Sequence, residues 1–310
     1  MARPGAARTF AAALSGASQC GASFVATPRA GRRASIALVL RVNPETGDEE
    51  ALFIKRTVRS GDPWSGNVAL PGGRREVGDR DDCATAAREC LEEVGVDVGD
   101  GARWEALGRI ADDRVVVNGR RPLVLSTFGF LRRDDAKARI EVAPQPSEVA
   151  HAWWVPTTAL ESENVAWRSL ALADAFAPLR KRPRVAKVLE ALGLTEVTFA
   201  CVRLPRPPGA AADADAAADA DAFALWGLTL SCLSDARRRA GLRPLVGPGA
   251  APDFARGFRG PNALSTTVLQ VAFAALRLAS RREAPAAFAF AAAALLLGAG
   301  AALLGRAPKS

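Results

Sequence analysis

The order of apolar and polar positions along the chain predicts an alternation of strands and helices. Two apolar runs separated by the turn "ETGDEE" predict strands at 34–42 and 51–56, and a loop rich in glycine and proline follows at 56–73. The segment "RDDCATAARECLEEV" at 80–94 has the spacing of a helix. Further strands are expected at 103–110, 122–131 and 151–156, short helices around 157–180 and 183–192, and a longer helix at 223–241.

The helix expected at 80–94 has its own start and stop signals. Asp81 or Asp82 is the expected N-cap, because a short acidic side chain accepts a hydrogen bond from a free amide of the first turn. Gly95 is expected to end the helix in a left-handed conformation.

Three other segments differ in composition. The Pro- and Ala/Asp-rich stretch 205–222 contains too little apolar surface to offset its chain entropy, so a disordered insert is expected there. A Gly/Pro-rich linker is expected at 242–262. Residues 286–305 are twenty positions without a charge, which is long enough to cross about 30 Å of hydrocarbon. We expect a C-terminal membrane anchor there; the alternative is an alanine-rich helix that packs on the protein.

The N-terminus contains six arginines and no acidic residue before Glu45. This composition is typical of an organelle transit peptide, which would place the protein in a mitochondrial or plastid matrix. The other interpretation of residues 1–30 is an ordinary disordered terminus.

Charge and residue usage narrow the chemistry. A net charge of +8 favours anionic partners, but the arginines are not interleaved with aromatic residues as in nucleic-acid-binding motifs, so no nucleic-acid partner is expected. The single histidine, His151, argues against Ser-His-Asp and Cys-His catalysis. The five cysteines form no CxxC pair, which argues against a zinc site. The oligomeric state is not predicted.

The helix at 80–94 contains the main candidate for chemistry. Glu89, Glu92 and Glu93 are spaced i, i+3 and i, i+4, so their carboxylates share one face, although like charges at this spacing repel. Carboxylates are the ligands of hard divalent cations such as Mg²⁺ or Mn²⁺. The glycines at Gly72 and Gly73 allow the backbone to approach such a cation closely.

This part of the chain resembles the Nudix box. The family pattern is a glycine, five residues, Glu, seven residues, Arg-Glu, two residues of which the first is apolar, Glu-Glu, any residue, Gly and an apolar residue. The segment from Arg88 to Val96 matches without exception, whereas Asp79 stands in place of the first Glu and eight residues separate it from Arg88.

An Asp with one extra residue is similar to the coenzyme A diphosphatase-like branch of the family. The segments "WSGNVALPGG", "RPLVLSTFGFL", "PSEVAHAWWVP" and "LWGLT" resemble that branch too, so the likeness covers about 34–240. The chain has Trp64-Ser65-Gly66 where the coenzyme A enzymes have His-x-Gly.

The resemblance implies an α/β/α sandwich with a mixed sheet over 34–240. It also implies a Mg²⁺- or Mn²⁺-dependent hydrolase that cleaves the diphosphate linkage of a nucleoside diphosphate derivative, such as coenzyme A or acyl-coenzyme A. The alternatives are another derivative, such as ADP-ribose or a dinucleotide, or a Nudix-fold binding module without turnover.

The resemblance also assigns roles to residues. Glu89, Glu92 and Glu93 are implied as metal ligands, with a backbone carbonyl from Gly72 or Gly73, and Arg88 is implied to orient the glutamates. One of the glutamates, or Glu148, is implied as the general base; the alternative for Glu148 is an exposed loop carboxylate. Candidates for phosphate recognition are Arg56, Arg74, Arg75 and Arg121.

Overall fold

The computed structural model describes residues 9–17, 32–60, 62, 64–116, 122–133, 140–171, 196–210 and 221–246. The chain divides into two compact units: Met1–Ala166 with Ala200–Ala250, and Trp167–Phe199 with Ala251–Ser310. In the second unit the described residues are 167–171 and 196–199. The site and the main sheet belong to the first unit.

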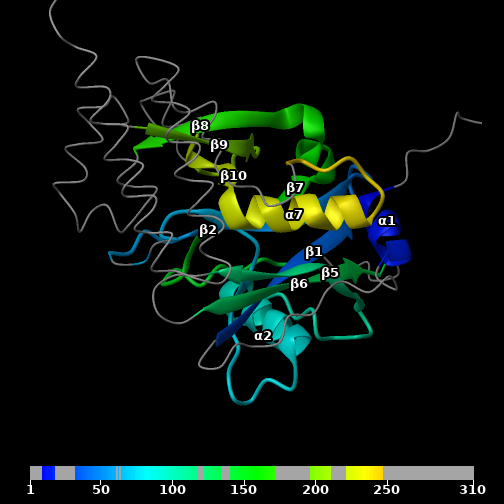
Figure 1. The fold of residues 1–310 in the computed structure, drawn as a ribbon. Coiled ribbons are helices and arrows are strands. Elements are labelled where there is room, and N and C mark those ends of the chain that lie inside the picture. Colours follow the sequence, from blue (N-terminus) through cyan, green and yellow to red (C-terminus); the bar gives the residue numbers. More distant parts are fainter. Residues whose placement is uncertain are drawn as a thin grey trace, which may run out of the picture. The chain divides into compact units, whose positions relative to one another are not determined.

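A seven-stranded mixed sheet forms the centre of the first unit (Figure 1). The strand order is β3-β2-β1-β6-β5, with β4 paired to β1 and β7 paired to β2. Strands β1 and β6 are parallel, and the other pairs in this sheet are antiparallel. The strands are β1 (Arg32–Val42), β2 (Glu49–Arg56), β3 (Val68–Ala69), β4 (Gly72–Arg74), β5 (Trp104–Val116), β6 (Leu123–Arg132) and β7 (Val149–Pro156).

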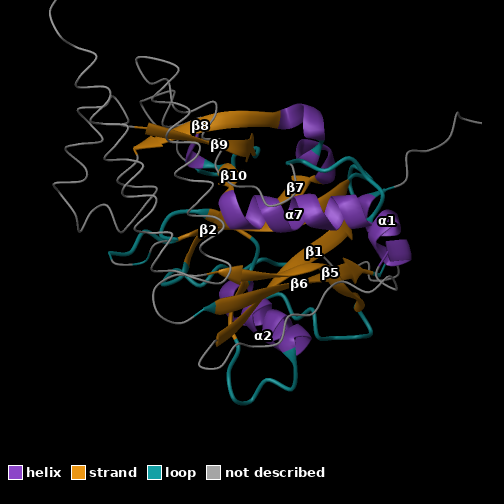
Figure 2. Cartoon of the chain, in the orientation of Figure 1, coloured by secondary structure: helices purple, strands orange, loops and turns teal. Residues whose placement is uncertain are grey.

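Helices cover both faces of this sheet (Figure 2). Strand residues alternate between the two faces: Ala37 and Val39 pack toward α2 (Asp82–Val94), whereas Leu38 and Leu40 pack toward α7 (Gly227–Arg239). The three layers confirm the α/β/α sandwich with a mixed sheet that the sequence predicts.

A helix of the N-terminal segment contributes to this core. Helix α1 (Phe10–Ala17) buries Phe10 and Leu14 in the cluster that contains α7. Its first turn is capped by Glu49, whose carboxylate accepts hydrogen bonds from the amides of Phe10 (3.0 Å) and Ala11 (2.8 Å). The expectation of disorder is therefore wrong for these residues, because a capped helix is formed there, whereas the transit-peptide interpretation of residues 1–30 stays a prediction.

A second sheet has the order β10-β9-β8, from β8 (Val165–Ala171), β9 (Glu196–Arg203) and β10 (Ala224–Trp226). The short helices expected from 157 are two 3-10 turns, Thr157–Leu160 and Ser162–Asn164, and β8 follows them. The helix expected at 183–192 lies outside the described residues.

The segment expected to be disordered at 205–222 begins in an ordered conformation. Trp153 donates its indole N–H to the carbonyl of Pro205 at 2.9 Å, and Pro207 is buried. Residues 211–220 of this segment lie outside the described residues.

Within the described ranges, none of the helices is long and apolar enough to cross a membrane. The candidate anchor at 286–305 and most of the linker at 242–262 lie outside those ranges.

Candidate functional site

The α2 helix is held in place by the caps that the sequence indicates. Asp81 is the N-cap: its backbone is extended and its carboxylate accepts the amide N–H of Ala84 at 2.8 Å. Gly95 ends the helix with a left-handed φ of 72°. Asp82 is the first helical residue, and its side chain is buried.

The glycine loop and the helix glutamates meet as the sequence predicts. Strand β4 pairs with β1, and the amide of Gly72 donates to Glu93 Oε2 at 2.9 Å. A Cβ at Gly73 would lie 2.4 Å from the carboxylate carbon of Glu89. A Cβ at Gly72 would lie 2.3 Å from the carbonyl oxygen of Ser35. Both positions therefore require glycine for a close approach.

Arg88 is the centre of the polar contacts on the exposed side of the site. Its guanidinium donates to both carboxylate oxygens of Asp79 (2.9 and 3.0 Å), to Glu89 Oε1 (3.0 Å) and to Glu92 Oε2 (2.8 Å). The carbonyl of Arg74 accepts a further bond at 2.9 Å. Asp79 thus reaches Arg88 despite its shorter side chain and the extra residue between them.

The carboxylates of the site differ in their electrostatics. Burial raises the pKa of Glu93 to about 7, and repulsion by Glu89 and Glu148 adds to this, while the Gly72 amide and Arg56 oppose it. Burial also raises the pKa of Glu89. The pKa of Asp79 is lowered, chiefly by its hydrogen bonds from Arg88. Two carboxylates that resist ionisation are suited to a position beside a cation.

The other predicted residues surround these glutamates. Arg56 pairs with Asp62 at 2.9 Å and lies 4.0 Å from Glu93. Glu148 is close enough to Glu89 and Glu93 to raise the pKa of each, and its carboxylate lies 3.5 Å from the guanidinium of Arg59. The structure therefore brings Glu148 toward the site, although its side chain is 42% exposed.

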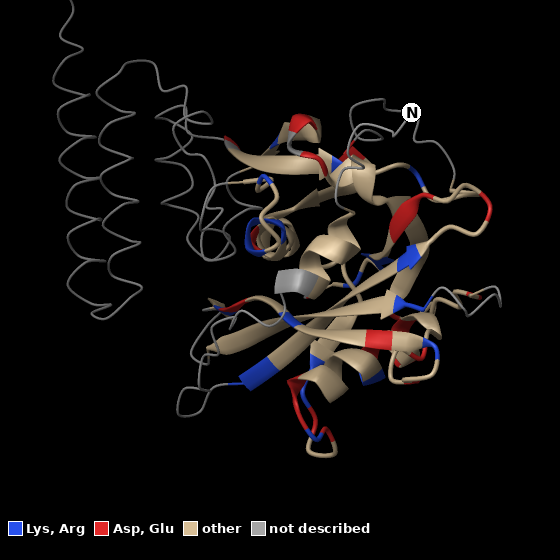
Figure 3. Ribbon diagram, turned by 90° about the vertical axis from the view of Figure 1, so that its right-hand side faces the viewer, with Lys and Arg blue, Asp and Glu red and all other residues tan. Residues whose placement is uncertain are grey.

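The remaining arginines are placed less favourably for phosphate recognition. The Arg75 guanidinium pairs with Asp82 at 3.2 Å, and the Arg74 side chain is exposed. Arg121 lies outside the described residues. Basic and acidic positions are scattered as short segments over a mostly uncharged ribbon (Figure 3), so net charge alone does not mark the substrate site.

The donor set fits a hard divalent cation. No three Asp, Glu, His or Cys side chains in the described part of the chain are already grouped as a metal site, and Arg88 bonds to both Glu92 and Glu89. Ser35, opposite Gly73 in the pairing of β1 with β4, has a buried hydroxyl without a hydrogen-bond partner. Oxygen donors that are buried and incompletely compensated are what a Mg²⁺ or Mn²⁺ site requires.

Comparison with known proteins identifies the family. A family model described as the NUDIX domain matches residues 31–189. The chain belongs to the Nudix family. A divalent metal such as Mg²⁺ or Mn²⁺ is typical of this family. The match covers α2, the glycine loop and Glu148, so all the residues of the site described above lie within it.

Three similar proteins place this Nudix chain among its relatives. It is 33% identical over 199 residues to the uncharacterized protein C14C4.10c of Schizosaccharomyces pombe, covering 58% of each chain. It is 39% identical over 66 residues to Nudix hydrolase 15, mitochondrial, of Arabidopsis thaliana, covering 21% of this chain and 22% of that one. A MutT/nudix family protein from Enterococcus faecalis has a TM-score of 0.33 at 18% identity, covering 43% of this chain and 47% of that chain. The chain thus spans less than two thirds of the length of these curated relatives.

The sequence does not predict four residues that contact the site residues or lie next to them. Three of them belong to no local motif: Arg33, Ser35 and Asp62. The sequence indicates only a helix-capping role for the fourth, Asp82. One signal was available for Arg33: a charged residue at the start of a continuous apolar strand needs a buried partner.

Proposed function

We propose that this Nudix protein is a metal-dependent hydrolase that cleaves the diphosphate linkage of a nucleoside diphosphate derivative. One observation supports this most directly: Glu93 is 2% exposed, carries a raised pKa and is bonded to the amide of Gly72. A buried carboxylate fixed against a glycine loop has no structural advantage over glutamine, but it is useful as a metal ligand.

Each residue has a distinct part in this proposal. Glu89, Glu92 and Glu93 would hold the Mg²⁺ or Mn²⁺ ion, with the carbonyl of Gly73 as a further candidate ligand. A bound divalent ion neutralises phosphate charge and lowers the pKa of a coordinated water. Arg88 keeps the glutamates oriented through its bonds to Glu89 and Glu92.

Glu148 is proposed to accept the proton of the attacking water. Its carboxylate lies 3.5 Å from the Arg59 guanidinium, and its charge affects both Glu89 and Glu93. A general base must lie within reach of the reacting water, and Glu148, in the loop before β7, is 42% exposed. Arg56 is proposed to contact substrate phosphate, because its guanidinium already lies beside Glu93.

Within this class, coenzyme A or acyl-coenzyme A is the proposed substrate. The support is the resemblance of the box, with Asp79 and one extra residue, to the coenzyme A diphosphatase-like branch. Asp79 makes a bidentate pair with Arg88, so this departure from the family pattern keeps Arg88 beside the glutamates. The presence of all three glutamates argues against a binding module without turnover. ADP-ribose and dinucleotides are the competing substrates.

The test is a substrate panel with and without Mg²⁺ or Mn²⁺. Coenzyme A, ADP-ribose, NADH and dinucleoside polyphosphates are incubated with the full chain, and released products are quantified. We expect coenzyme A to yield 3′,5′-ADP and 4′-phosphopantetheine, and Glu89→Gln or Glu93→Gln to reduce turnover by orders of magnitude. Glu105→Gln, at an exposed position of β5, is the control and should retain activity.

The outcomes separate the alternatives. Turnover of another derivative with coenzyme A untouched rejects the coenzyme A assignment and keeps the hydrolase. No metal-dependent turnover of any compound, with binding retained, favours the binding module. Activity that survives both glutamine substitutions rejects the metal site.

A further inference from the structure

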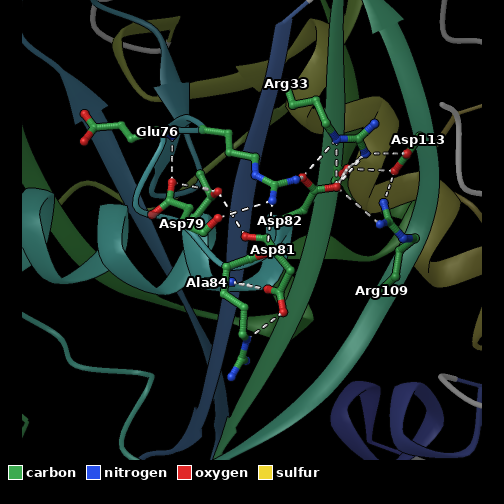
Figure 4. A network of polar contacts seen from close by, with 12 residues as sticks. Arg33, Glu76, Asp79, Asp81, Asp82, Ala84, Arg109 and Asp113 are labelled. Carbon is green, nitrogen blue, oxygen red and sulfur yellow. Dashed lines mark hydrogen bonds and ion pairs between the residues drawn. The ribbon is translucent and has the colours of Figure 1, made fainter. Parts of the chain in front are cut away.

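A buried polar cluster lies at the N-terminus of α2, beside the residues to which a chemical role is assigned above (Figure 4). Arg33, Asp82, Asp113 and Ser126 are each at most 8% exposed. With the partly exposed Arg75 and Arg109 they form what is called the Asp82 cluster below. Burying this many charges is costly unless each is paired, so the arrangement calls for a functional explanation.

One carboxylate joins most of these elements. Both carboxylate oxygens of Asp82 accept a hydrogen bond from Arg33 Nε at 2.9 Å. Asp82 Oδ2 also accepts one from Arg33 Nη2 at 2.5 Å. Arg75 Nη1 lies 3.2 Å and Arg109 Nη2 lies 3.5 Å from the same group. The first residue of α2 is thereby fixed to β1, to β5 and to the loop that follows β4.

A second buried carboxylate in the cluster, Asp113, contacts two of the same arginines. Asp113 accepts from Arg33 at 3.0 Å and from the hydroxyl of Ser126 at 2.8 Å. Arg109 pairs with Asp113 as well. Arg33 is therefore held from two sides, and it cannot follow Asp82 if α2 turns.

Asp82 lies on the same face of α2 as the catalytic glutamates. Glu89 and Glu93 come seven and eleven residues later, which is close to two and three full turns. The buried apolar side chains of α2 are Ala86, Cys90 and Val94. Apolar packing is not directional, whereas charge-assisted hydrogen bonds are.

The glycine loop is also connected to Asp82 and Arg33, through Arg75. The backbone amide of Arg75 donates to the carbonyl of Arg33 at 3.0 Å, and its side chain pairs with Asp82. Arg75 directly follows β4, which contains Gly72 and Gly73. Both halves of the site, loop and helix, are thus connected through Asp82.

We propose that Asp82 is a positioning residue, which holds α2 in the rotation at which Glu93 meets the amide of Gly72 and Glu89 lies against Gly73. The effect of Asp82 on turnover rests on the proposed function. The effect of Asp82 on the geometry of the glycine loop does not depend on that function, so the two effects are tested separately.

The test compares Asp82→Asn with Asp235→Asn. Asp235 is a matched control, because it is 3% exposed, accepts the Asp112 amide at 2.8 Å and pairs with arginines, but lies on α7, which packs in the other core cluster from α2. Both variants lose a buried charge. The readout is the amide signals of Gly72 and Gly73 in glycine-labelled, metal-free protein by NMR.

We expect Asp82→Asn to shift both amide signals and to weaken Mn²⁺ binding about 10–100-fold, as for other residues that orient metal ligands. The kcat should fall by a similar factor with KM unchanged. Asp235→Asn should leave the two amide signals, the Mn²⁺ affinity and the kcat at wild-type values. Unchanged glycine signals in Asp82→Asn, or equal shifts in the control, overturn the proposal. If wild type neither binds Mn²⁺ nor turns over, the proposed function fails while the amide comparison still decides.

A second variant covers the case in which Asp82→Asn does not fold. Arg75→Gln removes the link to the loop but leaves Arg33 on Asp82, and the Arg75 side chain is 34% exposed, so little stability is lost. We expect smaller shifts at the same two amides. Signals identical to wild type would overturn the role of the Asp82 cluster.

Discussion

Replacing Glu93 by glutamine should stabilise the metal-free protein while removing its activity. The pKa of Glu93 is raised from an ordinary value of 4.5 to about 7, with burial as the main cause. The folded state therefore binds the proton more tightly than the unfolded state does. This contribution to stability is fully present below pH 4.5 and is lost as the pH rises to 7.

The magnitude follows from the pKa values. One pKa unit corresponds to 1.36 kcal/mol, so the wild type loses about 3 kcal/mol at pH 8 relative to a neutral side chain. Glutamine has nearly the same shape, cannot ionise and can still accept the amide hydrogen of Gly72. We therefore expect Glu93→Gln to have a higher free energy of unfolding than wild type at pH 8, by as much as ~3 kcal/mol, with no difference near pH 4.

The assay is urea unfolding followed by tryptophan fluorescence, first in EDTA and then with Mn²⁺. Metal should reverse the order: at 1,000 times its Kd, a ligand stabilises the wild type by about 4.1 kcal/mol, which exceeds the ~3 kcal/mol advantage of the glutamine variant, and that variant should gain much less. Glu105→Gln, with an exposed side chain, should follow the wild type throughout. If Glu93→Gln is no more stable than wild type at pH 8 in EDTA, the argument from a buried, ionised carboxylate is wrong.

Three further outcomes are expected. Gly73→Ala should displace the Glu89 carboxylate, which lies 2.4 Å from the new Cβ, and should weaken Mn²⁺ binding with little change in the urea midpoint. Gly72→Ala should instead lower the free energy of unfolding by about 1–3 kcal/mol, because its Cβ meets the Ser35 carbonyl and its φ is 153°. The Cys83 thiol, whose pKa burial raises from 9.0 to about 11, should react with iodoacetamide at pH 8 about 100-fold more slowly than a free peptide, as read by mass spectrometry. The full chain should resist carbonate extraction from membranes and a chain ending at Glu283 should be soluble; complete extraction of the full chain would remove the C-terminal anchor.

The parts of the site that the sequence predicts are those set by local spacing. The i, i+3 and i, i+4 glutamates, the Asp81 cap and the Gly95 end all lie within one helix, so a single period and two cap residues are sufficient to place them. The strand expected at 151–156 also follows from local alternation: its neighbouring residues Trp153 and Trp154 pack against the two different core clusters.

The parts that it could not predict depend on contacts far apart in the chain. Glu49 caps a helix 39 residues before it, and Arg33 meets Asp82 and Asp113 at separations of 49 and 80 residues. Arg33 belonged to an acid-poor stretch that suggested a targeting peptide. The pairing of β1 with β6, the pairing of β6 with β5 and the packing of α2 on β1 bring its partners together.

The repulsion between Glu89 and Glu93 at i, i+4 is reduced but not removed by the fold. Arg88 holds Glu89, the amide of Gly72 holds Glu93, and the pKa of each carboxyl is nevertheless raised. Two groups with raised pKa values on one helix face destabilise the metal-free protein near neutral pH. A sequence under selection for stability alone would replace one of them by glutamine. That both are present, beside a loop where glycine is required, is best explained by a cation that binds between them.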